Sequence, residues 1–319
     1  MPFYLTALMI LFGIEVIYLR IAAYNEASLQ RPVGRSSHKS PTITGGGFIF
    51  CLAALAAVWM APSRGALFFA AGLSVASAVS FVDDFRPLGV SVRLAAQLAS
   101  VVLMLFGTGA LAAAPLWLWC AAAIGSAAYL NAFNFMDGIN GITAAYSAVL
   151  LAALMWLDSA YAFADPRLPA LTLCAVGVFA YFNFRPRAVC FAGDVGAISV
   201  ALVTLYMLVS LIAVTSSVWW IVLVAVYGVD TALTVVRRIF RRENIFRAHR
   251  LHLYQYLANE RRMPHLAVAA TYAAVQAAVD LGAWLSRDHL GVYFAAVTVL
   301  LSAAYLIILR HSHETTATR

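Results

Sequence analysis

Four acidic residues of this chain stand where long apolar runs begin or end, which is an unusual place for a carboxylate. Asp83 and Asp84 close one run in SFVDDFRPLG, Asp137 closes a second in NAFNFMDGING, and Asp194 opens a third in CFAGDVGA. A carboxylate is costly at bilayer depth, so a set of them at helix ends indicates a shared task. The chemistry that such a set favours is the binding of a hard cation such as Mg²⁺ against phosphates.

Each of these acids also has a structural interpretation. The Asp pair could stop a helix, because Pro87 and Gly89 follow it and both residue types interrupt helices. Asp137 could belong to an Asp-Gly turn between two helices, and Asp194 could cap the start of a helix. Adjacent carboxylates under an apolar run are expensive unless a cation or an arginine compensates them. We therefore interpret the pair, together with the other two acids, as a functional set.

Amides, an aromatic residue and glycines accompany the acids. Three-residue spacing would align four polar side chains along one face of a helical turn, and these are Asn131, Asn134, Asp137 and Asn140. Phe191, just before Asp194, could be a core aromatic or a stacking surface for a nucleotide base. The three glycines at 45–47 could give a helix a flexible start, or they could allow the close approach of another helix or of lipid.

The longest polar stretch, 235–264, contains eight arginines, among them Arg250, together with His249 and His252. Its positive charge could serve topology and attraction to anionic lipid, or it could bind phosphate. The two histidines alone are a weak zinc signal, because no third ligand has suitable spacing. A short amphipathic helix at the membrane surface is predicted from four residues near helical spacing, which are Leu251, Tyr254, Leu257 and Ala258.

The elements that must position these residues are membrane helices. With 63% hydrophobic and 11% charged residues among 319, the chain exceeds the roughly 45–50% apolar share of soluble domains. We expect an all-α polytopic membrane protein of about 11 transmembrane helices (10–11) that forms a single domain over 1–319. Apolar runs long enough to span a bilayer, roughly 17–25 residues each, are found near 3–19, 46–62, 65–82, 94–112, 115–130, 139–157, 168–183, 196–214, 217–234, 265–284 and 289–309.

The basic residues predict which side of the membrane each connection occupies. If successive connections alternate sides, eighteen of the 21 Lys and Arg residues fall on one side. The positive-inside rule makes that side cytoplasmic, the N-terminus periplasmic and the C-terminus cytoplasmic. Since these residues lie between apolar runs, we expect membrane lipid and no nucleic acid as a partner. The cytoplasmic loops expected to carry the site are 20–45, 83–93, 131–138, 184–195 and 235–264.

The first apolar run has no basic residue before Arg20. A cleaved signal peptide begins with a positively charged region, so we expect this run to be a retained helix.

Four motifs in this order resemble a known family. They are DDxxxLGxxxRLxxQ, NAFNxxDGxxGI, FNFxPxxxxFxGDxG and a basic HRxHLYQ loop, and they span the chain from about His38 to Gln255. This arrangement is similar to that of the polyprenyl-phosphate N-acetylhexosamine-1-phosphate transferases. That membrane superfamily includes the lipid-carrier GlcNAc-1-phosphate transferases and phospho-N-acetylmuramoyl-pentapeptide transferase.

In that family an oxygen of undecaprenyl phosphate attacks the β-phosphorus of a UDP-sugar, which releases UMP and leaves a lipid-linked diphosphosugar. The resemblance implies a Mg²⁺-dependent phosphoglycosyltransferase of the bacterial inner membrane, with Mn²⁺ able to substitute and the active site facing the cytoplasm. It implies undecaprenyl phosphate and a UDP-N-acetylhexosamine, or a 6-deoxy derivative, as substrates, and it allows a homodimer. Whether transfer is direct or passes through a covalent enzyme intermediate stays open.

The resemblance also assigns roles to particular residues. It implies that Asp83 and Asp84 handle the lipid phosphate, one of them as a candidate base. Asp194 becomes the principal Mg²⁺ ligand, with Asp83 as a second metal ligand, and Phe191 becomes the side chain that stacks on uracil. The other substrate-binding residues that it implies are Asn134, Asp137, Asn183, His249, Arg250 and His252.

Two positions depart from the family pattern. Many members carry a second acid in DGxDG where this chain has Asn140, so the role of that position is open. Many also have a longer histidine cluster where this chain has Tyr254 and Gln255. This HRxHLYQ form resembles the branch that initiates O-antigen and related surface glycans, and the identity of the sugar therefore stays open.

Two other functions compete with this interpretation. A transporter or flippase for a lipid-linked or anionic solute would place polar groups near the membrane midplane, whereas these acids lie at helix ends. A CDP-alcohol phosphatidyltransferase would carry a DGxxAR…DxxxD signature, which this sequence lacks.

Overall fold

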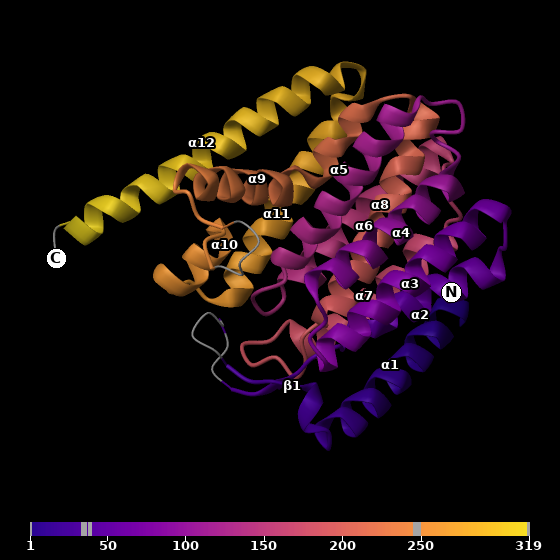
Figure 1. Ribbon diagram of the computed structural model, residues 1–319, viewed down its shortest axis with the longest axis horizontal. Helices are drawn as coiled ribbons and strands as arrows, with labels where there is room; N and C mark the ends of the chain where they lie inside the picture. The colour runs from indigo at the N-terminus through magenta and orange to yellow at the C-terminus, as the bar shows by residue number, and fades with distance from the viewer. Residues whose placement is uncertain (1, 33–36, 38–39, 245–249, 318–319) are drawn as a thin grey trace.

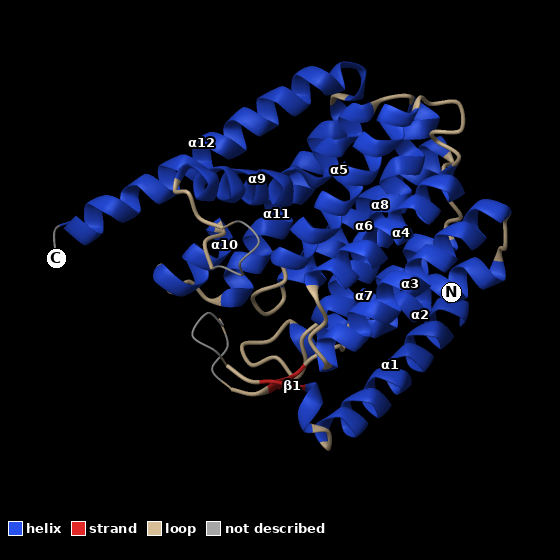
Figure 2. Ribbon diagram, viewed as in Figure 1, coloured by secondary structure: helices blue, strands red, loops and turns tan. Residues whose placement is uncertain are grey.

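The protein is a bundle of membrane helices joined by short connections (Figures 1 and 2). The computed structural model describes residues 2–32, 37, 40–244 and 250–317. The principal helices are α1 (Pro2–Ala23), α2 (Phe48–Met60), α3 (Arg64–Phe85), α4 (Val90–Thr108), α5 (Leu116–Phe135), α6 (Ile142–Tyr161), α7 (Arg167–Asn183), α8 (Gly193–Thr215), α9 (Ala225–Phe240), α11 (His265–Leu285) and α12 (Leu290–Ala317).

Short elements complete the chain. Two-residue strands β1 (Leu29–Gln30) and β2 (Thr42–Ile43) pair antiparallel. A 3₁₀ segment, η2 (Val218–Val224), leads into α9. The remaining elements are η1 (Glu26–Ser28), α10 (Leu253–Gln255), the π-helical turn η3 (Tyr256–Glu260) and η4 (Arg287–His289).

The helices confirm the predicted fold class. Within the described chain, nine segments are long and apolar enough to cross a membrane, and two shorter apolar helices, α2 and α7, accompany them. All eleven predicted apolar runs therefore become helices, although α2 is shorter than its run. The protein is an all-α polytopic membrane protein.

Helix α8 forms the centre of the bundle. Its side chains are apolar around the whole circumference, which is typical of a helix buried on all faces, and it packs against α2, α3, α5 and α6. The apolar window of α8 is 72% buried, whereas that of α12 is 11% buried. In Figure 1, α12 crosses the edge of the bundle and extends beyond it. Its exposed apolar surface is suited to contact with lipid.

The polar connections gather at one end of the bundle. The β1–β2 hairpin, α10 and the loop after α7 lie at the same end in Figure 2. Ile43 of β2 bridges Cys190 in parallel, so the loop before α2 is joined to the loop before α8. This end carries the residues predicted to form the site.

The predicted short helix of the last loop is present over 253–260, where the single turn α10 continues into the π-helical turn η3. Tyr254 is fully buried in the protein and its hydroxyl donates a hydrogen bond to the Phe135 carbonyl over 2.8 Å. This side chain therefore packs against the bundle, and contact of the segment with the membrane surface stays a prediction.

Candidate active site

Asp84 holds the start of α8 from the end of α3. One of its carboxylate oxygens accepts a hydrogen bond from the Asp194 backbone amide over 2.9 Å, and the other accepts one from the Val195 amide over 3.1 Å. The first amides of a helix have no partner inside that helix. A carboxylate that accepts hydrogen bonds from them is also stabilised by the positive end of the helix dipole. Asp84 thus supplies the cap of α8 and fixes the position of Asp194.

Gly193 makes this cap possible. Its φ is +71°, a conformation that residues with a side chain rarely adopt. A Cβ at this position would also lie 2.5 Å from an oxygen of Asp84. Glycine is therefore required where the carboxylate meets the helix.

Asp83 has different partners from its neighbour. Its Oδ1 accepts a hydrogen bond from the Leu88 amide, and its Oδ2 accepts one from the Arg93 guanidinium over 3.1 Å. The same guanidinium nitrogen lies 3.6 Å from Oδ2 of Asp194. Arg93, at the start of α4, therefore bridges two carboxylates that come from α3 and α8.

The carboxyl groups of Asp83 and Asp194 lie close together, because one guanidinium nitrogen of Arg93 contacts both, and the side chain of Asn134 interacts with Asp194. Two carboxylates this close repel unless a cation or a proton compensates them. The side chain of Asp83 is 10% exposed and that of Asp194 is 31% exposed, so Asp194 is the more accessible of the two. Asp83 and Asp194 together therefore form a site that attracts positive charge.

Asp137 lies between α5 and α6 and faces the same group of acids. The Thr143 hydroxyl donates a hydrogen bond to its Oδ1 over 2.5 Å. Burial raises the pKa of Asp137 to about 6, and the negative charge of Asp194 raises it further, although the hydrogen bond from Thr143 opposes the shift. Asp137 thus titrates close to neutral pH.

Two buried asparagines join the loops around the acids. Asn183 accepts a hydrogen bond from the Gly141 amide over 2.7 Å and donates one to the Cys190 carbonyl over 2.8 Å. Asn140 donates to the carbonyls of Arg185 and Pro186 over 3.0 and 3.2 Å. Both amides therefore scaffold the loops after α5 and α7, and Asn140 gains the role that the sequence left open. Direct contact of Asn183 with substrate stays a prediction.

Phe191 is fixed through its backbone. Its amide donates to the Ile43 carbonyl over 2.7 Å, and its carbonyl accepts from the Gly46 amide over 2.9 Å. The side chain is half-buried, which leaves part of the ring accessible for the predicted stacking role. The loop carrying Phe191 is thereby held against the glycines that precede α2.

A buried carboxylate that the sequence reasoning missed organises the last loop. Asp230 on α9 is 3% exposed. Its Oδ1 accepts a hydrogen bond from the Leu253 amide over 2.9 Å and lies 3.3 Å from Nδ1 of His252. Its Oδ2 accepts a hydrogen bond from the Tyr272 hydroxyl over 2.7 Å. Asp230 therefore fixes both the backbone and the predicted site histidine of the HRxHLYQ loop.

The structure describes some of the other predicted residues of this region and leaves others outside the described residues. Tyr254 joins the loop to the segment that carries Asp137 through its hydrogen bond to Phe135. Arg250 is half-buried, and its Nε has no hydrogen-bond partner among the described residues. His249 and His38 lie outside the described residues. The structure thus brings the last loop next to the acids without showing all of its predicted members.

Comparison with known proteins supports the interpretation of these motifs. Residues 66–212 match the model of glycosyl transferase family 4. Over these residues the chain is similar to that family. A relative described as a probable undecaprenyl-phosphate N-acetylglucosaminyl 1-phosphate transferase, from Bacillus subtilis strain 168, is 26% identical over 136 residues. The alignment covers 40% of this chain and 37% of the length of that relative.

The family match spans α3 to α8 and contains all four acids of the site, together with Arg93. Asp230 and the HRxHLYQ loop lie beyond the matched residues. The matched part of the chain thus supplies the paired acids, and the last loop lies outside it.

Asp83 and Asp194 are the described residues that could contribute carboxylates to a Mg²⁺ ion shared with substrate. No group of three or more His, Cys, Asp or Glu side chains suited to hold a metal occurs in the described part of the chain. Two carboxylates, Asp83 and Asp194, do converge, and their repulsion is compensated by Arg93. Mg²⁺ is commonly bound by one or two carboxylates, with substrate phosphates and water completing its octahedron.

Proposed function

We propose that this protein transfers an N-acetylhexosamine 1-phosphate from a UDP-sugar to undecaprenyl phosphate, with release of UMP, as the first step in building a surface glycan. The observation that carries the proposal is the convergence of Asp83 and Asp194 on Arg93 at the polar end of a membrane bundle. The match to glycosyl transferase family 4 supports a transferase, and the name of the relative supports a polyprenyl phosphate as the acceptor.

The proposed reaction exchanges one phosphorus–oxygen bond for another. A non-bridging oxygen of undecaprenyl phosphate forms a bond to the β-phosphorus of the UDP-sugar. The bond between that phosphorus and the oxygen bridging to the α-phosphorus breaks, and UMP leaves with that oxygen. The acceptor is already ionised at neutral pH, so the residues around it mainly orient the two phosphates.

The paired carboxylates are the proposed metal ligands, with Asp194 as the principal one. A bound Mg²⁺ would neutralise charge on the diphosphate, and phosphoryl transfer depends mainly on such neutralisation and on positioning. Asp84 keeps the start of α8 in place through its two backbone hydrogen bonds. Arg93 balances the charge of the two acids and presents a guanidinium where phosphate groups would enter.

The donor is proposed to lie between the loops that surround the acids. Asn134 and Asp137 would face its diphosphate, and Phe191 would stack on uracil. His252 and Arg250 would contact phosphate or sugar from the last loop, which Asp230 holds in position. These assignments use side chains from separate connections that meet at one end of the bundle (Figure 1).

The proposed location is the bacterial inner membrane, with the site facing the cytoplasm. A UDP-sugar is soluble and cytoplasmic, and the basic residues predict that the connections bearing the acids lie on the cytoplasmic side.

The test is an omission experiment on the purified, lipid-reconstituted protein. UMP release should require a UDP-N-acetylhexosamine, Mg²⁺ and undecaprenyl phosphate together, and removal of any one should abolish it. Mn²⁺ should restore part of the activity lost with chelator. UMP release without the lipid phosphate would indicate a hydrolase, and transport without UMP release would indicate a carrier; either result would overturn the proposal.

A further inference from the structure

A chain of buried polar groups, none of which belongs to the site described above, joins α6 to α11. The Tyr146 hydroxyl on α6 donates a hydrogen bond to Oε1 of Gln276 on α11 over 2.7 Å. The Gln276 side-chain amide in turn donates to Oδ1 of Asp280 over 2.7 Å. Asp280 is 8% exposed, and its Oδ2 has no hydrogen-bond partner among the described residues. The polar chain therefore ends on an unsatisfied carboxylate oxygen.

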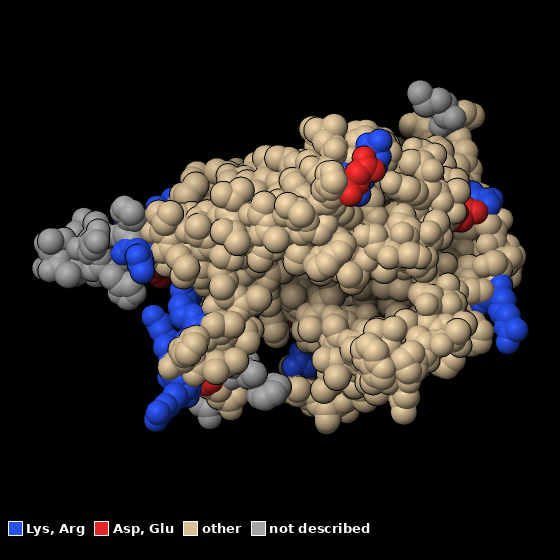
Figure 3. Space-filling view, turned by 90° about the horizontal axis from the view of Figure 1, so that it is seen from above, with Lys and Arg blue, Asp and Glu red and all other residues tan. Residues whose placement is uncertain are grey.

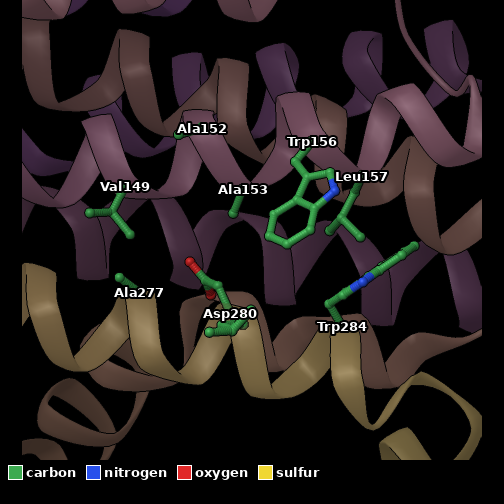
Figure 4. A pocket seen from close by; sticks show the side chains of 9 residues that line it. Val149, Ala152, Ala153, Trp156, Leu157, Ala277, Asp280 and Trp284 are labelled. Carbon is green, nitrogen blue, oxygen red and sulfur yellow. The ribbon is translucent and has the colours of Figure 1, made fainter.

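That carboxylate lines a cavity between α6 and α11. The cavity has a volume of about 240 Å³. Small side chains at Ala152, Ala153 and Ala277 create the space. Figure 4 shows Asp280 reaching from α11 toward α6 beside the indole rings of Trp156 and Trp284. Within this lining Asp280 is the single acidic side chain.

The charge and shape of this cavity favour a cation. A buried carboxylate with a free acceptor position is costly in a membrane unless a donor or a counter-charge meets it. The two indole rings lie 5.7 Å apart between centroids, and the faces of tryptophan rings attract cations. A primary ammonium offers both a positive charge and hydrogen-bond donors to Oδ2, whereas a hydroxyl would leave the charge uncompensated.

The position of the cavity indicates where the cation comes from. Trp156 and Trp284 lie in the last turns of α6 and α11, at a level where tryptophan commonly meets lipid headgroups. Arg287 is exposed just beyond α11, with its guanidinium 4.7 Å from the centre of the Trp284 ring. A negative group inside the cavity and a positive group outside it complement the ammonium and phosphate of a zwitterionic lipid.

We propose that the cavity between α6 and α11 binds the headgroup of a phospholipid with a primary amine, such as phosphatidylethanolamine. The ammonium donates to Oδ2 of Asp280 beside the paired rings of Trp156 and Trp284, and the phosphate faces Arg287. This inference is independent of the proposed transferase reaction, because it uses none of the residues of that site.

The experiment measures lipid binding to the purified, delipidated protein by native mass spectrometry. Phosphatidylethanolamine, phosphatidylcholine and phosphatidylglycerol with identical acyl chains are added in separate titrations. The wild-type protein should bind phosphatidylethanolamine at least about tenfold more tightly than phosphatidylcholine, a difference of about 1.4 kcal/mol. The trimethylated amine of phosphatidylcholine cannot donate a hydrogen bond, and phosphatidylglycerol has no cation.

Two variants and one control test whether the preference for phosphatidylethanolamine depends on Asp280 and on the cavity. Asp280→Asn should reduce the preference to about one, because the amide carries no charge and offers a donor where the ammonium needs an acceptor. Ala153→Leu should have the same result by filling the cavity, and it leaves the hydrogen bond between Gln276 and Asp280 intact if Asp280→Asn fails to fold. Asp288→Asn changes an exposed carboxylate near the same end of α11 and should keep the wild-type preference.

Three results would overturn the inference. One is equal binding of phosphatidylethanolamine and phosphatidylcholine to the wild-type protein. Another is retention of the preference by Asp280→Asn or by Ala153→Leu in folded protein. The third is stronger binding of phosphatidylglycerol, which would assign the contact to an anionic headgroup.

Discussion

Asp83 and Asp84 are adjacent in the sequence, but the helix turns their side chains toward different partners. Successive residues of an α-helix differ in direction by about 100°, so one carboxylate meets Arg93 and the other meets the first amides of α8. The residue pattern predicted that the pair is functional, and only the family resemblance distinguished its members, by making Asp83 a second metal ligand. The difference in their partners depends on where α8 starts, about a hundred residues later, which local pattern cannot show.

Asp137 provides a test based on pH. Thr143→Val should remove the hydrogen bond that lowers the pKa of this carboxyl group. If the ionised form is required, kcat/KM of the wild-type protein falls as the pH drops below about 6. In Thr143→Val the pKa is higher, so this decline should begin at higher pH. The pH dependence of UMP release measures the shift.

A buried threonine on another helix serves as the control for this prediction. Thr172→Val removes a hydroxyl that donates to the Leu168 carbonyl within α7, and the pH profile should stay unchanged. A profile of Thr143→Val that superimposes on the wild-type profile would show that ionisation of Asp137 does not govern the reaction.

Asp230 should position the last loop. In Asp230→Asn a side-chain NH2 group could face the backbone amides of Leu253 and Tyr254, which now donate to the carboxylate. Two donors cannot pair, so the loop that carries His252 should move. A misplacement of about 1 Å can cost about a hundredfold in rate, and we expect kcat/KM for the UDP-sugar to fall on that scale, with KM for the donor rising more than KM for the lipid. Hydrogen exchange over 250–256 should increase.

The control for Asp230 is Asp288→Asn, an exposed carboxylate outside the site, which should leave both KM values unchanged. A looser loop in Asp230→Asn with unaltered kinetics would mean that the loop takes no part in donor binding. Asp230, as an acid inside the apolar run 217–234, is a local signal that sequence reasoning overlooked, but the sequence alone does not show which residues it contacts. Its partner Tyr272 is 42 positions away.

At the scale of elements, the apolar runs predicted every principal helix, because length and hydrophobicity together decide which segments can cross a bilayer. Their boundaries depend on contacts that hydrophobicity does not encode. The run near 46–62 becomes a helix only from Phe48, because the glycines before it pack against the start of α8 instead. A Cβ at Gly47 would lie 2.4 Å from Cα of Gly196. Of the two interpretations of these glycines, the structure supports close approach to another helix.

Gly47→Ala tests this contact. The added methyl group must push α2 away from α8, and overpacking of this kind typically costs about 1–3 kcal/mol. The Tm of the purified protein in detergent should fall. Gly177→Ala, inside α7, is the matched control, because a Cβ there meets nothing within 4 Å and alanine favours a helix by roughly 0.5–1 kcal/mol. Equal Tm values for the two variants would contradict close packing at Gly47.

At the scale of the whole molecule, the chain separates charge from apolar surface. Figure 3 shows a face that is mostly uncharged, with most of its Lys and Arg side chains toward the end where α12 finishes. The sequence predicted this separation because basic residues occur between apolar runs. It could not predict which connections touch, since contacts such as Asp84 with Val195 join residues 111 positions apart.

The orientation of the chain follows from the same distribution of charge. With eighteen of 21 basic residues on one side, the segment after Leu309 should be cytoplasmic. A C-terminal alkaline phosphatase fusion should be inactive and a C-terminal fluorescent-protein fusion bright. The same reporters joined in the predicted periplasmic connection after α6 serve as the control and should behave in the opposite way. An active C-terminal phosphatase would place the acids away from cytoplasmic UDP-sugars.

The most direct test of the central claim is the rate of UMP release by purified Asp194→Asn. This variant keeps the size of the side chain. It also leaves intact the hydrogen bonds that the first backbone amides of α8 donate to Asp84, so it should insert and fold like the wild-type protein. Loss of the charge should reduce turnover at least about a hundredfold, as expected for a group that stabilises the transition state. Asp165→Asn, which changes a carboxylate paired with Arg167 outside the site, should retain normal turnover. Near-normal turnover of folded Asp194→Asn would contradict the claim that the paired carboxylates carry phosphoryl transfer.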